Sequence, residues 1–311
     1  MITDESNFRE NTPIQMIWSS TENHLYVKRD DLYPLSFGGN KARKGRLFFR
    51  EIDASNADCI VTYGSGSSNH CRVVANLAAM RGLPCIVVIP YETATVSTNS
   101  RMVRMMGAEY RACPLAKVSE TIDQTLAELR AGGYHPYFIP GGGHGNLGTR
   151  AYVEAYREIL QFEEENDIAF SHIFFASGTG TTQAGLVCGQ RLYQRQNQEI
   201  VGISIARKNP RGQQIVLDSI ESYLGTDAVK QDNVHFIDTY VDGYGQGNAA
   251  VSAIIRRELL QNALPLDATY TGKAFYGMEC YIKENDIRGE NILFLHTGGT
   301  PLFFDYLEQT P

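Results

Sequence analysis

The sequence of 311 residues has few cysteines, no long apolar run and no excess of positive charge. Its six cysteines, Cys59, Cys71, Cys85, Cys113, Cys188 and Cys280, form no C-x-x-C pair, which argues against a zinc knuckle, a redox dithiol or a disulfide framework. No apolar run reaches the roughly 18 residues of a membrane span, and the N-terminus lacks the charged and apolar regions of a signal peptide. These absences predict a cytoplasmic protein with reduced thiols and no bound metal.

The charge balance is acidic, with 28 Lys and Arg residues against 35 Asp and Glu residues and a net charge of -7. A chain of this balance has no sequence-independent attraction to nucleic-acid phosphates or anionic lipid. With 43% hydrophobic and 20% charged residues, the composition is that of a folded globular protein with a sizeable core. We therefore expect a small-molecule ligand as the partner, and neither a nucleic acid nor a membrane.

Short apolar runs rich in Ile, Val and Phe alternate with helix-length amphipathic segments along the whole chain. The runs predict strands over 25–28, 58–63, 85–89, 109–112, 137–139, 172–176, 201–205 and 292–296. The segments between them predict helices over 43–51, 69–81, 99–106, 118–131, 147–160, 182–194, 213–224, 249–261 and 274–285. This alternation predicts an α/β architecture with mostly parallel sheets.

Glycine concentrates where predicted strands end and helices begin. The four clusters are residues 64–68, 141–145, 178–182 and 298–300. Any one cluster has a purely structural explanation, because a tight turn with positive φ favours glycine. Four of them at strand ends indicate a ligand site, since backbone amides at helix N-termini bind phosphate or carboxylate.

Two clusters predict different ligands. Residues 143–148, GHGNLG, match G-x-G-x-x-G, and an acidic patch follows at 163–165, which is a pattern of dinucleotide-binding turns. Residues 177–182, SGTGTT, surround a helix start with hydroxyls and amides but lack the Gly-Lys pair of a mononucleotide loop. The first pattern predicts a nicotinamide-dependent oxidoreductase, and the second predicts a cup for the single phosphate of a smaller cofactor.

A lysine motif near the N-terminus and the motifs that follow it carry a family resemblance. In chain order the motifs are KRDDL (28–32), GGNKARK (38–44), SNH (68–70), SGTGTT (177–182), GYG (243–245), YTGK (270–273) and HTGG (296–299). In this order and spacing the chain resembles fold-type II pyridoxal-phosphate enzymes, specifically the family of D-cysteine desulfhydrase and 1-aminocyclopropane-1-carboxylate (ACC) deaminase. The resemblance covers nearly the whole chain and implies pyridoxal 5'-phosphate (PLP) as the cofactor.

The resemblance implies an architecture of two open, mostly parallel twisted sheets, similar to the tryptophan synthase beta chain, with the cofactor in the cleft between two domains. It implies a large PLP-binding domain of residues 1–49 and 156–311 and a small inserted α/β domain of residues 50–155. It also implies a homodimer.

The resemblance assigns the cofactor contacts residue by residue. Lys41 is implied to link covalently to PLP, which requires a neutral amine, and burial near cations such as Lys44 or Arg43 would favour the neutral form. Lys44 is implied to reach the cofactor phosphate and Asn69 to bond the 3-hydroxyl group. The implied phosphate cup is Ser177, Gly178, Thr179, Gly180, Thr181 and Thr182, and the implied neighbours of the ring nitrogen are Thr271 and Thr297.

The same resemblance assigns the catalytic and substrate contacts. Lys41 is the first candidate for the base that removes the α-proton. Tyr244 and Tyr270 are implied to protonate or orient the leaving group. The implied substrate-binding residues are Ser68, Asn69, His70 and His144. The amides of Ser68 and Asn69 open a helix and are implied to hold the substrate carboxylate, and His144 is a further polar contact. Ser68 also counts among the catalytic residues.

Two departures from the ACC deaminase pattern favour a desulfhydrase-like enzyme. Thr271 stands where the deaminases have a glutamate that protonates the ring nitrogen, and His70 stands where they tend to have glutamine. We therefore expect β-elimination from a β-substituted amino acid, of D configuration by the resemblance, giving pyruvate and ammonia. The alternatives are an ACC deaminase, a lyase acting on L-cysteate or a specialised amino acid, and a catalytically idle PLP-binding protein. Residues 64–67, GSGS, replace a bulkier family sequence and leave the substrate open.

Overall fold

The computed structural model describes residues 11–20, 22–195, 197–226, 228–240 and 248–308. Within these residues the strands form two sheets. The larger has the order β1-β2-β10-β7-β8-β9, and its strands are β1 (Ile14–Ser19), β2 (Asn23–Lys28), β7 (His172–Ser177), β8 (Glu199–Ser204), β9 (His235–Ile237) and β10 (Glu290–Leu295). The smaller has the order β5-β4-β3-β6, and its strands are β3 (Cys59–Tyr63), β4 (Cys85–Pro90), β5 (Glu109–Cys113) and β6 (Pro136–Ile139).

Nearly all described strand pairs are parallel, and the exception is β1 with β2. Parallel strands need crossover connections, and helices supply them. The helices are α1 (Asn40–Asp53), α2 (Asn69–Ala79), α3 (Thr98–Met105), α4 (Val118–Ala131), α5 (Asn146–Asn166), α6 (Thr181–Leu192), α7 (Arg211–Leu224), α8 (Ala249–Asn262), α9 (Thr271–Glu284) and α10 (Thr300–Glu308). Short 3-10 turns lie at Asp30–Leu32, Tyr91–Thr93, Leu115–Lys117, Gly141–Gly143 and Gln231–Asn233.

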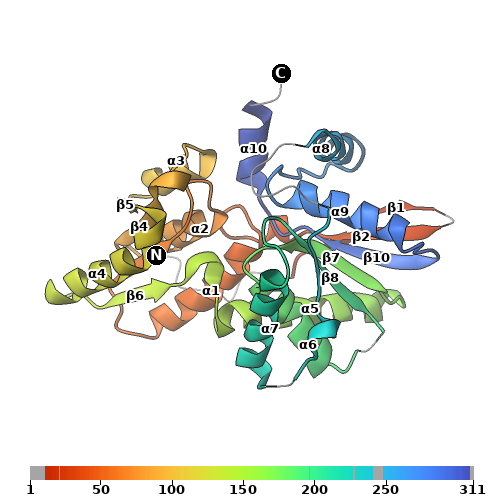
Figure 1. Ribbon diagram of the computed structural model, residues 1–311, viewed down its shortest axis with the longest axis horizontal. Helices are drawn as coiled ribbons and strands as arrows, with labels where there is room; N and C mark the ends of the chain where they lie inside the picture. Colours follow the sequence, from red (N-terminus) through yellow and green to blue (C-terminus); the bar gives the residue numbers. More distant parts are fainter. Residues whose placement is uncertain (1–10, 21, 196, 227, 241–247, 309–311) are drawn as a thin grey trace.

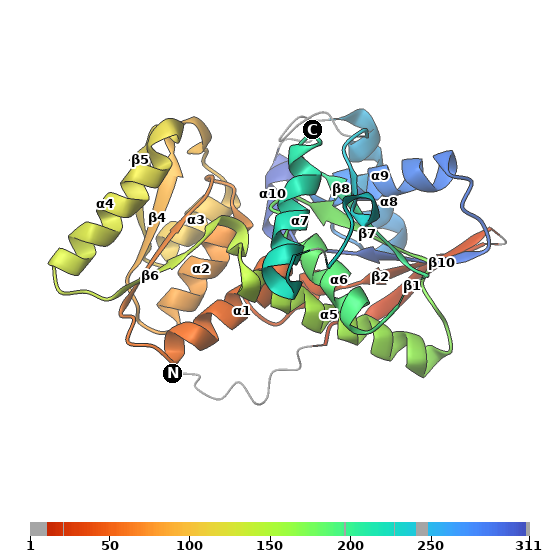
Figure 2. The same ribbon diagram turned by 60° about the horizontal axis from the view of Figure 1, so that its bottom comes forward.

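The two sheets lie in two lobes side by side (Figures 1 and 2). The orange and yellow lobe holds the smaller sheet with α2, α3 and α4. The other lobe combines the red N-terminal strands with the green and blue C-terminal half of the chain, so the segment around the smaller sheet is an insertion into the larger lobe. Helix α1 runs between the lobes, with Leu47 packed in a core of the larger lobe and Phe48 in the core of the smaller one.

Strand β7 shows why a parallel strand reads as a continuous apolar run. Ile173 and Phe175 face the core made with α5, α6 and α7, whereas Phe174 and Ala176 face the core made with α8, α9 and α10. Because both faces of the sheet are covered by helices, successive side chains are all buried. The site that follows β7 is therefore held by a strand packed on both sides.

The α/β fold with two mostly parallel sheets is confirmed, and most predicted elements differ from the observed ones only at their ends. The sequence analysis missed β1, β9 and α10. No helix within the described ranges is long and apolar enough to cross a membrane. The strands of the smaller sheet fall within residues 50–155, but the domain boundaries at 49/50 and 155/156 stay a prediction.

Candidate active site

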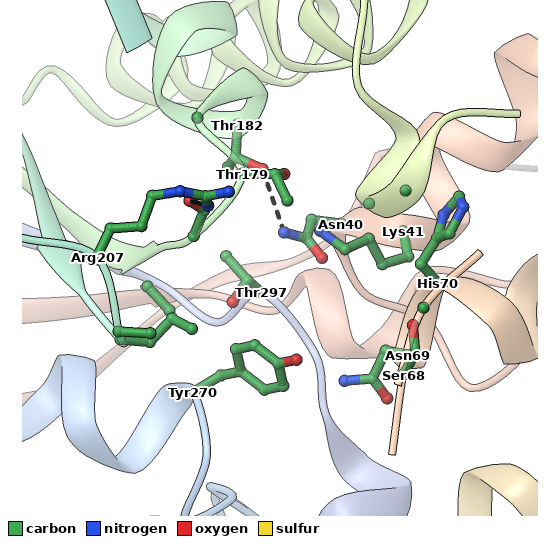
Figure 3. A pocket seen from close by; sticks show the side chains of 18 of the residues that line it. Asn40, Lys41, Ser68, Asn69, His70, Thr179, Thr182, Arg207, Tyr270 and Thr297 are labelled. Atoms are coloured by element: carbon green, nitrogen blue, oxygen red, sulfur yellow. Dashed lines mark hydrogen bonds between the residues drawn. The ribbon is translucent and has the colours of Figure 1, made fainter. Parts of the chain in front are cut away.

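Loops after parallel strands of both sheets line one cavity of about 580 Å³ (Figure 3). Ligand sites of open α/β sheets lie at the carboxyl ends of their strands, and this cavity follows that rule. The described residues that line it are Asn40, Lys41, Tyr63, Gly64, Ser68, Asn69, His70, Gly141, Gly142, Ala176, Gly178, Thr179, Gly180, Thr182, Ile205, Ala206, Arg207, Lys208, Arg211, Tyr270, Thr297 and Gly298. Ten of the predicted site residues are thus brought together: Lys41, Ser68, Asn69, His70, Gly178, Thr179, Gly180, Thr182, Tyr270 and Thr297.

A glycine turn places Lys41 in the first turn of α1. Gly38 and Gly39 have φ of 64° and 89°, and a Cβ on Gly39 would lie 2.7 Å from the carbonyl oxygen of Thr297. The amide of Asn40 donates to that same oxygen at 3.0 Å. The turn therefore requires glycine, and it holds the start of α1 against the loop that follows β10.

Burial sets the acidity of Lys41. The protein removes water from its Nζ and lowers its pKa from 10.5 to about 8. Arg43, proposed above as a cationic neighbour, is instead tied to Asp30 at 2.9 Å and to Glu158 at 2.6 Å. Burial, and not a nearby positive charge, is therefore the cause of the lowered pKa.

The ion network around Arg43 fixes α1 from behind. Arg43 donates two hydrogen bonds to Asp30 and two to Glu158, and the buried Lys28 donates to Glu158 at 2.5 Å. Burial by itself would raise the pKa of Asp30, but the charges of Arg43 and Lys28 lower it below its ordinary value. Asp30 therefore stays ionised inside the protein.

The predicted phosphate cup lies at the N-terminus of α6. The loop after β7 passes through Gly178, Thr179 and Gly180, and Gly180 precedes the helix with φ 92° and no side-chain cap. The amides of the first helical turn have no partner within the helix and carry the positive end of its dipole. Thr182 lines the cavity and accepts a hydrogen bond from Asn40 Nδ2 at 3.1 Å (Figure 3). Such a helix start suits a phosphate group.

Three residues predicted to contact the phosphate, Ser177, Thr181 and Lys44, do not line the cavity. Ser177 is buried and its hydroxyl donates to Gln183 Oε1 at 2.9 Å. Lys44 is buried and donates from Nζ to Thr181 Oγ1 at 2.7 Å, and burial, then the charge of Lys41, lowers its pKa well below the ordinary value. Lys44 and Ser177 thus brace the start of α6 from within, and the contact of Lys44 with the cofactor phosphate stays a prediction.

The start of α2 supplies hydrogen-bond donors on the opposite side. Ser68 caps the helix, with its Oγ accepting from the amide of Cys71 at 3.2 Å, and its own amide donates to Ser65 at 3.1 Å. The Ser68 amide is therefore occupied, so the amides left for a carboxylate are those of Asn69 and His70, with the Ser68 hydroxyl beside them. This corrects the expectation that the Ser68 amide takes part.

The side chain of Asn69 is held by a neighbour. Asn99 Nδ2 donates to Asn69 Oδ1 at 2.9 Å and to the carbonyl of Ser67 at 2.9 Å. Since the Asn69 oxygen is taken, its amide nitrogen is the end that remains for a ligand (Figure 3). That nitrogen is a donor, which suits the predicted bond to a ring oxygen.

The start of α9 brings Tyr270 into the cavity but not Thr271. The buried Asp267 accepts from the amide of Tyr270 at 2.7 Å and from the hydroxyl of Thr271 at 2.7 Å. Thr271 is fully buried, and its side chain serves this cap. Of the two residues predicted beside the ring nitrogen, Thr297 lines the cavity and Thr271 does not, which corrects that assignment.

Other expectations fall outside the cavity. Tyr244 lies outside the described residues. His144 is exposed, lies 3.4 Å from the hydroxyl of Ser219, and does not line the cavity. The turn at 143–148 is closely packed, since a Cβ on Gly148 would collide with the carbonyl of Gly143; none of its residues lines the cavity. Of residues 64–67, only Gly64 does.

The sequence analysis missed a cationic wall made of Arg207, Lys208 and Arg211. Arg207 donates to the carbonyl of Gly178, and burial, then the charge of Arg211, lowers its pKa. None of the described lining residues is Asp or Glu. Arg207 and Lys208 follow strand β8, so the rule that loops after parallel strands line the cleft points to them.

These features define a class of protein: an α/β enzyme in which a lysine of lowered pKa and a phosphate cup share one cleft at the carboxyl ends of two parallel sheets. A family model described as pyridoxal-phosphate dependent enzyme matches residues 6–298, and the chain belongs to this family.

Individual relatives agree with this family. The D-cysteine desulfhydrase of Klebsiella pneumoniae (strain 342) is 33% identical over 297 aligned positions, and the match covers 91% of this chain and 88% of the relative. The D-cysteine desulfhydrase of Serratia proteamaculans (strain 568) is 32% identical over 297 residues, 92% of this chain and 89% of the relative. A solved structure described as the ACC deaminase homologue is 30% identical, with a TM-score of 0.84 over 97% of this chain and 93% of that one. The predicted cofactor and family are confirmed.

The residues of the cavity fit PLP. The uncapped start of α6 suits the phosphate group, and Gly180 at φ 92° lets the backbone turn into the helix there. Lys41, with its pKa lowered to about 8, suits attack on the aldehyde. Thr297 and the Asn69 amide remain as hydrogen-bonding groups for the ring. A phosphate site and a reactive amine within one cavity match the two ends of this cofactor.

Proposed function

We propose that the protein is a PLP-dependent lyase that performs β-elimination on a β-substituted amino acid, as D-cysteine desulfhydrase does, and gives pyruvate and ammonia. The observation that carries the proposal is that Lys41, whose pKa is lowered to about 8, shares one cavity with the phosphate cup and with Tyr270. The two relatives named D-cysteine desulfhydrase support the substrate class.

In this proposal the protein's own groups bind the substrate and move its protons. The amides of Asn69 and His70 and the hydroxyl of Ser68 hold the substrate carboxylate at the start of α2. Lys41 Nζ, once released from its link to the cofactor, takes the α-proton. When bound, PLP supplies the electron sink that accepts the pair left at the α-carbon. The Tyr270 hydroxyl donates a proton to the departing β-substituent.

The bonds balance without another reactant except water. The C–H bond at the α-carbon and the bond from the β-carbon to the leaving group break, and a carbon–carbon double bond forms. The released 2-aminoacrylate becomes the imine, which takes up one water and gives pyruvate and ammonia. For D-cysteine the thiol group departs with the Tyr270 proton as hydrogen sulfide. No oxidant is needed.

A second candidate substrate has an anionic leaving group, as L-cysteate does. The observation that favours it is the cationic wall of Arg207, Lys208 and Arg211, together with the lack of Asp and Glu among the described lining residues. A sulfonate on the β-carbon, which leaves as sulfite, would offset these charges after the cofactor phosphate has taken its place in the cup. A neutral thiol on the β-carbon would not offset these positive charges.

A substrate panel tests both candidates. Purified, PLP-loaded protein is assayed for pyruvate and 2-oxobutyrate with D-cysteine, L-cysteine, L-cysteate, β-chloro-D-alanine and ACC, beside the Lys41→Ala variant. The proposal predicts pyruvate from at least one β-substituted amino acid and none from the variant. Release of 2-oxobutyrate from ACC alone would make the protein a deaminase, and release of neither keto acid would overturn the lyase proposal. An Arg207→Gln variant that raises KM for L-cysteate, but not for D-cysteine, would favour the anionic substrate.

The resemblance also supports a homodimer, and the cytoplasmic location expected in the sequence analysis stays a proposal. Sedimentation velocity of the PLP-loaded protein tests the first: a dimer predicts about twice the 34.6 kDa mass of the chain.

A further inference from the structure

The hydrogen bonds of His70 determine which of its ring nitrogens carries the proton. Thr62 Oγ1 donates to the carbonyl oxygen of Ile139 at 2.8 Å, because a carbonyl only accepts. The hydroxyl has one proton, so its second contact, 2.8 Å to His70 Nε2, must be one in which it accepts. His70 therefore carries its proton on Nε2, and Nδ1 is an unprotonated acceptor.

His70 holds this state across the working pH range. Burial, followed by the charges of Lys41 and Lys44, lowers its pKa to about 3. The ring is 4% exposed, and it lines the cavity. Among the described residues, Nδ1 has no hydrogen-bond partner, so it is a fixed acceptor without a donor.

Lys41 is the cavity residue that would need a fixed hydrogen-bond acceptor. Lys41 gains a third proton and a positive charge when it takes up the α-proton, and no Asp or Glu is found among the described lining residues. A buried ammonium without acceptors is costly. His70 and Lys41 both line this cavity, and the charge of Lys41 acts on the His70 ring.

We propose that His70 is a positioning residue whose Nδ1 accepts a hydrogen bond from the protonated amine of Lys41, while Thr62 holds its ring in the tautomer that this requires. The proposal rests on the proposed role of Lys41 as the base. His70 stabilises the proton-loaded state of Lys41 without adding a negative charge to the cavity. A carboxylate in its place would hold the proton too tightly for Lys41 to return it.

Other charged groups around Lys41 do not supply this acceptor. The titratable groups that share the cavity lining are Tyr63, His70, Arg207, Lys208, Arg211 and Tyr270, and Lys44 lies behind on the same helix. The arginines and lysines only donate. Tyr270 is assigned to the leaving group, and Tyr63 packs against Gly141.

The test measures the pKa of Lys41 in the cofactor-free protein. Lys41 is methylated with formaldehyde and borohydride at a series of pH values, and its peptide is quantified by mass spectrometry. His70→Leu removes the acceptor and is expected to lower the Lys41 pKa by about one unit, a tenfold change in the proton equilibrium. His70→Gln can still donate to Thr62 and accept from the cavity side, so it should restore the pKa to within about 0.3 unit.

His144→Leu is the matched control, because this histidine lies outside the cavity lining; it should leave the Lys41 pKa unchanged. An unchanged pKa in His70→Leu, or a failure of His70→Gln to restore it, would overturn the inference. Nitrogen NMR of ring-labelled wild-type protein decides the matter even where a variant does not fold. The inference predicts a bare Nδ1 and a protonated Nε2 at neutral pH, and a protonated Nδ1 would refute it. Absence of pyruvate would overturn the proposed function but leave these readouts interpretable.

Discussion

Raising the pH should speed the covalent attachment of PLP to the cofactor-free protein, with a midpoint near the pKa of Lys41. Only the neutral amine attacks an aldehyde, and the pKa of Lys41 is lowered from 10.5 to about 8 by burial. At pH 7 about a tenth of Lys41 is then neutral, against roughly 0.03% for an ordinary lysine. The buried amine therefore has about a 300-fold larger reactive fraction at this pH.

Stopped-flow recording of the visible absorbance of the bound cofactor measures this rate over pH values from about 6 to about 10. A free lysine derivative serves as the reference for an unperturbed amine, and Lys41→Ala serves as the control for attachment elsewhere. We expect a plateau above the midpoint and a tenfold fall for each pH unit well below it. A midpoint near 10.5 would show that burial does not act on Lys41 as the structure indicates.

The remaining predictions concern the phosphate cup and the buried ion network. Gly180→Ala places a Cβ 2.7 Å from Ile215 Cγ2 at φ 92° and should weaken PLP binding at least tenfold, as measured by fluorescence titration. Gly225→Ala is the control, because Gly225 also has positive φ but has open space around it, and this variant should leave PLP affinity unchanged. A PLP affinity of Gly180→Ala equal to that of Gly225→Ala would mean that the phosphate cup accommodates the added methyl group. Arg43→Met leaves Asp30 and Glu158 without one of their partners and should lower the free energy of unfolding, measured in urea, by about 3–5 kcal/mol. Arg111→Ala, which removes a surface ion pair, should lower it by less than about 1 kcal/mol. Similar losses for the two variants would contradict the importance assigned to the buried network.

The sequence predicted the buried strands well because their pattern is strong. The strand at His172–Ser177 is covered on both faces and appears as an unbroken apolar run. Strand β1 lies at an edge, half of its residues are exposed, and it pairs antiparallel, so its apolar pattern is weak. Strand β9 has only three residues, and α10 follows the glycine cluster at 298–300, after which the sequence analysis named no helix. Such short or edge elements are decided by tertiary contacts.

The candidate site divides in a similar way. Lys41, Asn69 and Thr179 were predicted from motifs that lie at helix starts, and local sequence determines those positions. Lys44 and Thr271 belong to the same motifs, but each turns to a partner that is distant or buried: Thr181 for Lys44 and Asp267 for Thr271. No spacing rule reports where a side chain on a helix points once another helix packs against it. The cationic wall carries no motif, and only its position after a parallel strand marks it.

The account depends most directly on Lys41 as the lysine that bears the cofactor. Borohydride reduction of the PLP-loaded protein makes that link permanent, and peptide mapping by mass spectrometry then locates it. We expect the cofactor mass on the peptide that contains Lys41 and none in the Lys41→Ala variant. A label on Lys44, or on any other lysine of the wild-type protein, would contradict the account.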